Sequence, residues 1–409
     1  MSETNKKHDI QALKARHKLL NECQYEIKPI EKGYTNRTLY VNISTNEIKE
    51  KPVTREMKEK FTGGKGFDLK LMWDAVKDDT RWNDPENEIN IATGPIGGNT
   101  NYPGSGKSIV TSISPITGIP IDSNVGGYFG PYLKFSGFDA LEIQGKAAND
   151  IIIFIDGNKG LVQILEAPGE AVDTHILSEQ LVEMFAEKEI EKQHISSVSA
   201  GTGSEHAYIG CLNFSFYDKR RKVPRLKQAG RGGIGTVFRD KKIKALVVKY
   251  SGVKGNSNRP VDLDKLQRTG LKLHNEIMER DDQMCRMRKL GTANLVDVMN
   301  EYDLLPTMNY KFGSHEQAKN LSADVFYEQY LTHNVPDGCW YGCTMACSHA
   351  ADNFKLETGP YKGEIVTVDG PEYETVAGVG SNVGIFDPRT VLEINFYCDT
   401  YGLDTISFG

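Results

Sequence analysis

The spacing of apolar residues changes once along this 409-residue chain, between residues 250 and 260. Before that point, apolar and polar residues often alternate with the period of a β-strand, as from Leu39 to Ile43. After it, apolar residues recur mostly at helical spacing. We therefore expect an α+β protein, in which a strand-rich N-terminal domain precedes a mainly helical one. Its expected parts are an extension over residues 1–33, the strand-rich domain over 34–255 and the helical domain over 260–409.

Three stretches carry signals for particular helices. Residues 10–20 place apolar side chains on a narrow stripe of a basic helix, which we expect to be solvated. Residues around 343–350 also have helical spacing. The strongest signals flank residues 387–400, because Asp387 is suited to cap a helix start and Gly402 to end a helix.

The composition excludes several classes of protein. With 49 basic and 55 acidic residues, the net charge of −6 indicates no general affinity for nucleic acid or an anionic membrane. The longest apolar runs, such as Ile151 to Ile155, have the length of a strand and are too short to span a membrane. The N-terminus is polar, and the seven cysteines are odd in number and unevenly placed. We therefore expect a protein of the reducing cytoplasm.

Three of the seven thiols, those of Cys339, Cys343 and Cys347, lie within nine residues. Soft thiolates at this spacing suit an iron–sulfur cluster or zinc, with reduced packing cysteines as the alternative. The paired Cys-x-x-Cys knuckles of structural zinc are absent, which favours the cluster. A closed site needs four ligands, and only Cys398 follows in the sequence. We therefore expect the site to need a ligand that this chain does not contain.

Glycine-rich runs indicate where the backbone could approach a large anion. Asn124–Gly130 and Gln228–Gly235 both open bare amides that can cradle phosphate, and Lys227 and Arg231 add positive charge. The run Tyr102–Ser108 is similar to a nucleotide-binding loop, but its glycine and lysine are too close together, which excludes a nucleoside triphosphatase. Each run alone is more often an ordinary turn. Together they favour a large cofactor that carries phosphate.

Carboxylates follow the cysteines. Glu372 and Glu374 lie in the run Gly370-Pro-Glu-Tyr-Glu, and Asp399 and Asp404 lie near the end of the sequence. Such groups can act as an acid or a base, or accept hydrogen bonds from a heterocycle, although each alone is more often a solvated charge. The residues by themselves thus predict a cytoplasmic redox protein with a cluster and a bulky anionic cofactor.

The most distinctive stretches of this sequence resemble motifs of the aldehyde ferredoxin oxidoreductase family of tungsten–pterin enzymes. The resemblance covers about residues 35–409, with the motifs in the family's order. The stretches that carry it are Gly126–Gly130, Leu133–Asp139, Ala229–Gly235, Gly370–Glu374 and Asp399–Ser407. It implies a pterin-binding first domain, and a tungsten or molybdenum ion held by two pterins. It also implies a [4Fe–4S] cluster beside that ion and a magnesium ion that bridges the pterin phosphates.

The resemblance also implies roles for single residues. Lys107 stands where the family usually has an arginine that links cluster and pterin, and Glu374 matches a glutamate near the metal. Lysine keeps the charge of arginine but loses its planar fork. The matched cofactor residues are the cluster ligands Cys339, Cys343 and Cys347, the pterin–magnesium residues Asn124 and Gly126, the phosphate-side residues Lys227, Gln228, Gly230 and Arg231, and the first pterin motif with Asp399, Leu403 and Asp404.

The activity that the resemblance implies is oxidation of aldehydes to carboxylates, with ferredoxin or an iron–sulfur subunit as electron acceptor. A benzoyl-CoA reductase-like catalytic subunit of a larger redox complex is the alternative within the family. A non-catalytic, cluster-binding electron-transfer fragment is the alternative of another class. The family's second pterin motif and fourth cluster cysteine lie beyond Gly409, so we expect the helical domain to be incomplete. A second chain or a missing C-terminal part, in an anaerobic oligomer, is expected to supply them.

Overall fold

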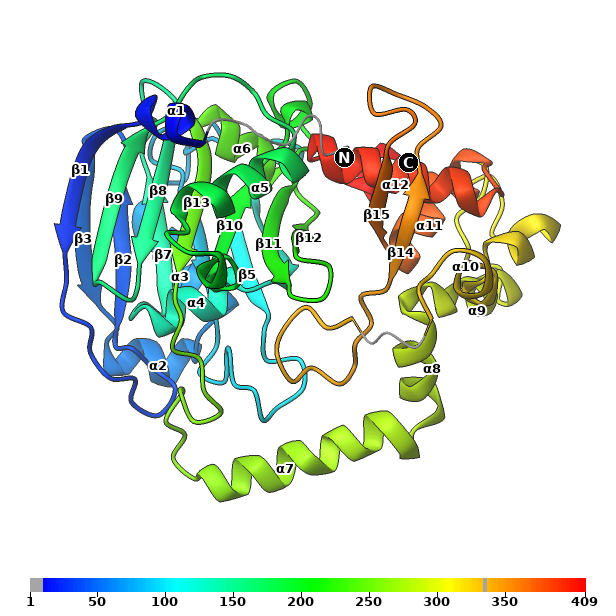
Figure 1. Ribbon diagram of the computed structural model, residues 1–409, viewed down its shortest axis with the longest axis horizontal. Helices are drawn as coiled ribbons and strands as arrows, with labels where there is room; N and C mark the ends of the chain where they lie inside the picture. Colours follow the sequence, from blue (N-terminus) through cyan, green and yellow to red (C-terminus); the bar gives the residue numbers. More distant parts are fainter. Residues whose placement is uncertain (1–9, 334–336) are drawn as a thin grey trace.

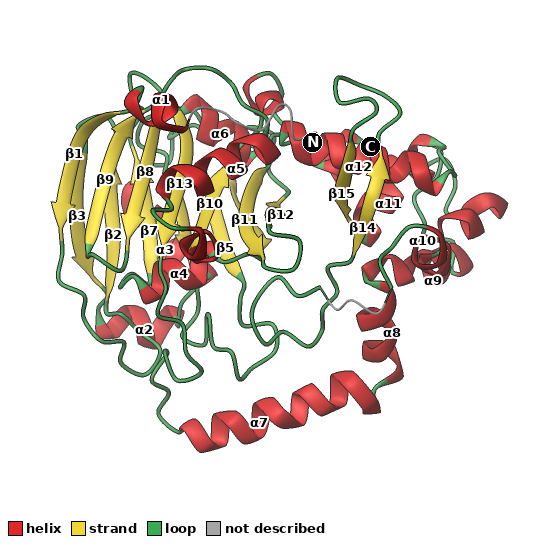
Figure 2. Ribbon diagram, viewed as in Figure 1, coloured by secondary structure: helices red, strands yellow, loops and turns green. Residues whose placement is uncertain are grey.

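The computed structural model describes residues 10–333 and 337–409 and contains two large β-sheets (Figures 1 and 2). The first sheet has seven strands, of which β8 and β13 pair in parallel and the other neighbours pair antiparallel. Its order is β1 (Lys18–Gln24), β9 (Leu161–Glu166), β8 (Ile151–Asp156), β13 (Ile243–Lys249), β10 (Ile195–Ser199), β11 (Leu212–Asp218) and β12 (Val223–Ala229).

The second sheet has six strands, and only β2 and β7 pair in parallel. Its order is β3 (Glu47–Pro52), β2 (Arg37–Asn42), β7 (Ala140–Gln144), β4 (Ile89–Ala92), β5 (Ser108–Ile113) and β6 (Pro120–Val125). Helices α2 (Arg55–Phe61) and α3 (Lys65–Ala75) cover its outer face, while α1 (Ile10–Ala15) and α5 (Thr174–Phe185) lie on the outer side of the seven-stranded sheet.

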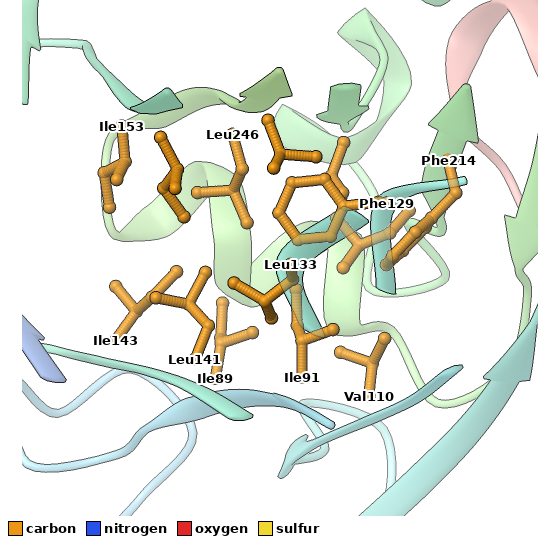
Figure 3. Close-up of a cluster of buried hydrophobic side chains, with 14 of the residues drawn as sticks. Ile89, Ile91, Val110, Phe129, Leu133, Leu141, Ile143, Ile153, Phe214 and Leu246 are labelled. Atoms are coloured by element: carbon orange, nitrogen blue, oxygen red, sulfur yellow. The ribbon is translucent and has the colours of Figure 1, made fainter. Parts of the chain in front are cut away.

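The main hydrophobic core lies where the inner faces of the two sheets meet (Figure 3). Ile91 and Leu141 point inward from the six-stranded sheet, and Ile153 and Leu246 point inward from the seven-stranded one. Helix α4 (Phe129–Phe135) fills the space between them, together with α6 (Ile234–Asp240). Because side chains alternate along a strand, the period-two pattern of the sequence places one face of each sheet in this core.

Helices dominate from Leu263 onward, so the α+β class is confirmed; the division into domains remains a prediction. A long helix, α7, runs along one edge of the molecule to this part, which has its own apolar core (Figure 1). Its elements are α7 (Leu263–Asn275) with a π-helical turn (Glu276–Arg280), α8 (Asp282–Leu290), α9 (Leu295–Glu301), α10 (Ala323–Gln329), the hairpin of β14 (Ala350–Lys355) and β15 (Ile365–Asp369), α11 (Tyr373–Val379), α12 (Pro388–Tyr401) and α13 (Thr405–Phe408).

Local signals predicted some helices correctly and others wrongly. Asp387 caps α12 by accepting a hydrogen bond of 2.9 Å from the amide of Thr390, and Gly402 ends α12 with φ +69°, as expected. The helix expected over residues 10–20 ends at Ala15, because residues 18–24 pair as an edge strand with β9. The part of the N-terminal extension formed by residues 1–9 lies outside the described residues.

The helix expected around residues 343–350 is also wrong. The chain turns there instead, since Gly342 and Ala346 have left-handed φ values of +76° and +43°. A bridge between Asp337 and Cys347 then leads the chain into β14. Separately, none of the helices in the described ranges is long and apolar enough to cross a membrane.

Candidate functional site

Nearly all of the residues that the motifs single out line one cavity of about 590 Å³. The cavity lies among the ends of β6 and β12, the loop before α11, and the turn that links α12 to α13. Only two predicted site residues, Cys339 and Cys343, are missing from its lining. The predicted residues that line it are Lys107, Asn124, Gly126, Lys227, Gln228, Gly230, Arg231, Cys347, Glu374, Asp399, Leu403 and Asp404.

Residues 337–347, which carry Cys339, Cys343 and Cys347 and are called the cysteine segment below, pack directly on the N-terminal sheets. Gly126 makes this possible, because a Cβ atom at its position would lie 2.8 Å from the sulfur of Cys339. Gly106 likewise leaves room for Trp340, whose side chain is 3% exposed and packs edge-on against Tyr128 at 5.2 Å. Cys339 therefore lies beside the cavity wall even though it does not line the cavity.

The three clustered thiols lie close enough to affect one another. Burial, with repulsion from Glu372, Cys339 and Cys343, raises the pKa of the Cys347 thiol to about 11, against the opposing charge of Lys227. A thiol must lose its proton to bind a metal, so an incoming cation has to replace this proton.

The thiol arrangement can be tested against the two kinds of metal site. Within residues 10–333 and 337–409, no three His, Cys, Asp or Glu side chains converge closely enough to hold a single metal ion. A [4Fe–4S] cluster has a different requirement, because each thiolate binds a different iron. Cys339, Cys343 and Cys347 are all free thiols of the kind that binds cluster iron, and Cys347 lines the cavity. Cys211 also lines the cavity, and its thiol lies near Asp399, Asp404 and Cys398.

Two buried aspartates, Asp399 in the last turn of α12 and Asp404 at the start of α13, have different partners. Asp404 caps α13, because its carboxylate accepts hydrogen bonds from the amides of Ile406 and Ser407 at 3.1 and 3.3 Å. Asp399 receives no side-chain hydrogen bond from the described part of the chain. Burial, together with the charge of Asp369, raises its pKa well above the usual range. Asp399 is therefore the carboxyl group available to a ligand.

Backbone hydrogen bonds fix this turn against the seven-stranded sheet. The amide of Cys211 donates to the carbonyl of Gly402 at 2.8 Å, and the amide of Asp404 donates to Ile209 at 3.0 Å. Gly402 has no room for a side chain, since a Cβ atom there would lie 2.4 Å from the amide nitrogen of Gly201. The segment from Asp399 to Asp404 thus packs on the N-terminal part through close backbone contacts.

The cations around the cavity fall into two groups. Lys227, on β12, is 12% exposed and pairs with Asp369, while the Gln228 side chain donates to Asn213 at 3.4 Å. Lys107 and Arg231 are exposed, and neither makes an ion pair or hydrogen bond with the residues that the structure describes. These two side chains are free to meet the charge of an anionic ligand.

Asp369 is the site residue that sequence reasoning missed. Although burial acts to raise its pKa, the charges of Arg225 and Lys227 hold that pKa at about 2. Arg225 binds one carboxylate oxygen at 2.5 Å and Lys227 binds the other. The only sequence signal is its place directly before Gly370, because nothing in the pattern of β15 indicates a partner 144 residues away.

Glu374 projects from the first turn of α11 and is exposed at the cavity. Its neighbour Glu372 accepts a hydrogen bond from Thr292, whose hydroxyl in turn accepts one from the amide of Tyr373 at 3.0 Å. This arrangement fixes the start of α11 and leaves the Glu374 carboxylate open to the cavity, where it could exchange a proton with a bound molecule.

The two-sheet fold and the cavity define a class of protein, one with space for a large anionic group between the thiol of Cys347 and the exposed cations Lys107 and Arg231. The family model for "Aldehyde ferredoxin oxidoreductase, N-terminal domain" matches residues 38–250, and the model for "domains 2 & 3" matches residues 268–409. The chain belongs to the aldehyde ferredoxin oxidoreductase family.

Several named proteins are similar to this chain. The tungsten-containing aldehyde ferredoxin oxidoreductases of Pyrococcus horikoshii and Pyrococcus furiosus are 31% and 33% identical over 379 and 384 residues. Each alignment covers 92% of this chain and 57% of the relative, so the chain spans little more than half of these relatives. The aliphatic sulfonate oxidoreductase, WOR-like subunit, of P. furiosus is 28% identical over 389 residues, which are 92% of this chain and 58% of that protein.

The fold also occurs in a solved structure, the active-site complex BamBC of benzoyl coenzyme A reductase with 1,5-dienoyl-CoA. The match has a TM-score of 0.69 and 23% identity, and it covers 91% of this chain and 54% of that one. At this identity the likeness shows the shared fold.

Proposed function

We propose that this chain forms the core of a tungsten–pterin and [4Fe–4S] oxidoreductase, which oxidises aldehydes to carboxylates and passes the electrons to a ferredoxin-type acceptor. Molybdenum in place of tungsten is compatible with the same residues. The observation that carries the proposal is that motif residues from widely separated segments line one cavity, with Cys347 in its wall. The family membership and the tungsten-containing relatives support it.

The cavity residues suit an anionic pterin in three ways. Lys107 and Arg231 would meet its phosphate, because both are charged and exposed and make no ion pair with residues 10–333 or 337–409. The bare amide of Gly230 at the end of β12 would let the phosphate approach the backbone, and the adjoining residues Asn124 and Gly126 would lie on the magnesium side. Asp399 would accept or donate hydrogen bonds at the heterocycle, since no described side chain occupies its carboxyl group.

The proposed reaction sets requirements for protons and electrons. Conversion of an aldehyde and one water molecule to a carboxylate releases two electrons and three protons. When bound, the metal–pterin group would supply two-electron chemistry and the cluster would supply single-electron transfer. Glu374 is the open carboxylate at the cavity, so we assign it the proton-accepting role.

We further propose that a ferredoxin or an iron–sulfur subunit accepts the electrons in an anoxic, reducing cytoplasm. Cys339, Cys343 and Cys347 supply three cluster ligands in this proposal. Cys398 is a buried residue of α12 and does not line the cavity, so we do not assign it as the fourth ligand. A further polypeptide region, in the same or another subunit of the assembly, would provide that ligand.

Metal and cofactor analysis of protein purified without oxygen tests the proposal. Iron, tungsten or molybdenum, and pterin in the same material, with aldehyde-dependent reduction of viologen dye, would support it. Iron without metal or pterin would instead support a non-catalytic electron-transfer protein. Turnover of benzoyl-CoA without turnover of aldehydes would replace the aldehyde reaction. A Glu374→Gln variant should retain cofactors and lose most aldehyde turnover, whereas a Glu301→Gln variant, at an exposed glutamate on α9 that does not line the cavity, should keep both.

A further inference from the structure

Beside the cavity, eight charged side chains form a connected ion-pair network with four positive and four negative members. Six of them are at most 12% exposed, which is unusual for charged groups. They come from β11, β12 and the turn between them, from the cysteine segment and from the β14–β15 hairpin. The members are Arg220, Arg221, Arg225, Lys227, Asp218, Asp337, Asp352 and Asp369.

Asp337 occupies the middle of the network. Arg221 approaches its carboxylate at 3.1 Å, Arg225 at 3.3 Å and Arg220 at 3.6 Å. Asp337 lies two residues before Cys339, and its backbone forms the bridge to Cys347. The amide of Ser348 donates a hydrogen bond of 3.1 Å to the carbonyl of Asp337. The cysteine segment is therefore tied to the network at one residue.

Asp369 occupies the end of the network nearest the cavity. It receives Lys227 and Arg225 from β12, and it directly precedes the loop that leads to Glu374. Arg221 extends the network in the other direction, to Asp352 on β14 at 2.7 Å. Lys227 is thus connected to the cysteine segment through Asp369, Arg225 and Asp337, with no solvent-exposed pair in between.

The balance of charge in the network has an electrostatic consequence for whatever binds the thiols. Charges in a buried site act over several ångströms with little screening. Removing one aspartate leaves the network with one excess positive charge, and removing one arginine leaves one excess negative charge. The potential of an iron–sulfur cluster responds to such nearby charge, because reduction adds an electron to the cluster.

We infer that this network holds the cysteine segment against β12, the strand that carries Arg225 and Lys227, and that the balance of its charges at Asp337 sets the reduction potential of the cluster. The inference rests on the proposed function, since it requires a cluster on the cysteines. Asp337 and Arg221 are positioning residues: both act through the cysteine segment, and neither lines the cavity beside Lys227.

A pair of opposite substitutions tests the inference in the cofactor-loaded protein. The reduction potential of the cluster is measured by a redox titration followed by electron paramagnetic resonance. Asp337→Asn should shift the potential to more positive values, and Arg221→Gln should shift it to more negative values. The double variant should lie near the wild type. A role that is only structural predicts shifts of one sign or none, so either of those results would overturn the inference.

Two further variants guard the test against misfolding. Asp352→Asn changes the network at its more exposed end and should give a smaller positive shift, even if Asp337→Asn loses its iron. No shift in Asp352→Asn, when Asp337→Asn cannot be measured, contradicts the inference. Glu56→Gln, which breaks an exposed pair with Lys60 on α2, should leave the potential unchanged. Wild-type protein that contains no iron would instead refute the proposed function itself.

Discussion

The apolar core between the two sheets and the ion-pair network beside the cavity are both largely buried, yet different forces stabilise them. The network, called the wall below, is the set of eight charged residues around Asp337 and Asp369. The core consists of apolar side chains such as Phe129 and Leu246, which are fully buried and need only to fill space. The wall consists of ion pairs such as Arg225 with Asp369, where each member needs one particular partner. The comparison teaches that the core is robust to exchange among apolar residues, whereas the wall fails when one partner is lost.

The largest effect on stability is expected in the core. Phe129→Ala should lower the free energy of unfolding by about 3–5 kcal/mol, because it removes a ring that is 0% exposed and leaves a cavity. Urea unfolding followed by circular dichroism measures this. Phe312→Ala is the matched control, since its side chain is 50% exposed, and it should change stability by at most about 0.5 kcal/mol. Equal losses in the two variants would contradict this account of the core.

In the wall, Asp369→Asn should cost about 3 kcal/mol, although the side chain keeps its size, because Lys227 and Arg225 lose their buried counter-charge. The same urea experiment measures the loss, with Glu59→Gln, from an exposed pair with Arg55, as a control near zero. A second change, Asp369→Asn with Lys227→Met, should recover part of the loss. If it recovers none, the pairing with Lys227 is not the cause.

Acidic groups in the two regions should respond to pH in opposite ways. Glu88, directly before β4 of the six-stranded sheet, has its pKa raised to about 8 by burial and by Glu142, so its contribution to stability is greatest below pH 4.5 and declines up to about pH 8. Asp369, with its pKa held at about 2, loses its contribution only as the pH falls from about 4 to 2.

The Glu88→Gln variant isolates the first of these effects. Relative to the wild type it should gain on the order of 2 kcal/mol in unfolding free energy between pH 4.5 and 8, because the neutral amide does not ionise. Urea midpoints across this range measure the gain. A difference between the two proteins that does not change with pH would show that Glu88 ionises as freely in the folded state as in the unfolded one.

A smaller effect on stability is expected at Gly126, where the cysteine segment touches the end of β6. Gly126→Ala should cost about 1–2 kcal/mol, because the added methyl group would lie 2.8 Å from the Cβ and sulfur of Cys339. The displaced thiol should also lower the iron content of the protein, which elemental analysis measures. Gly94→Ala is the matched control, because no atom lies within 4 Å of its added methyl group. Normal iron content in Gly126→Ala would separate this contact from cluster binding.

The smallest effect on stability is expected at Lys107. Lys107→Gln removes an exposed charge that forms no ion pair within the described part of the chain, and it should change the unfolding free energy by at most about 0.5 kcal/mol. Pterin retained through gel filtration should nevertheless fall, while Lys107→Arg should retain as much as the wild type or more. Lys60→Gln, on the distant helix α2, is the control for a general effect of charge. Full retention of pterin in Lys107→Gln would remove this residue from the proposed site.

Much of the fold could be predicted from short-range pattern. Alternation identified β2, an apolar run of strand length marked β8, and the capping residues located α12 within a residue or two. The pattern failed where distant partners decide the structure. Residues 18–24 are a strand because β9 lies beside them, and β12, which carries Lys227, was missed because its polar residues show no clear alternation.

The sequence by itself determined the α+β class, the ends of its best-capped helix and the motifs that mark the family. These follow from neighbours a few residues apart, whose spacing is visible in the chain. Only the tertiary structure decided that the motifs line one cavity, that Cys339 rests on Gly126, and that Asp369 pairs with Lys227 and Arg225. Those contacts join residues more than 100 positions apart. No local spacing encodes them, because the residues next to a charged side chain do not indicate which distant residue will pair with it.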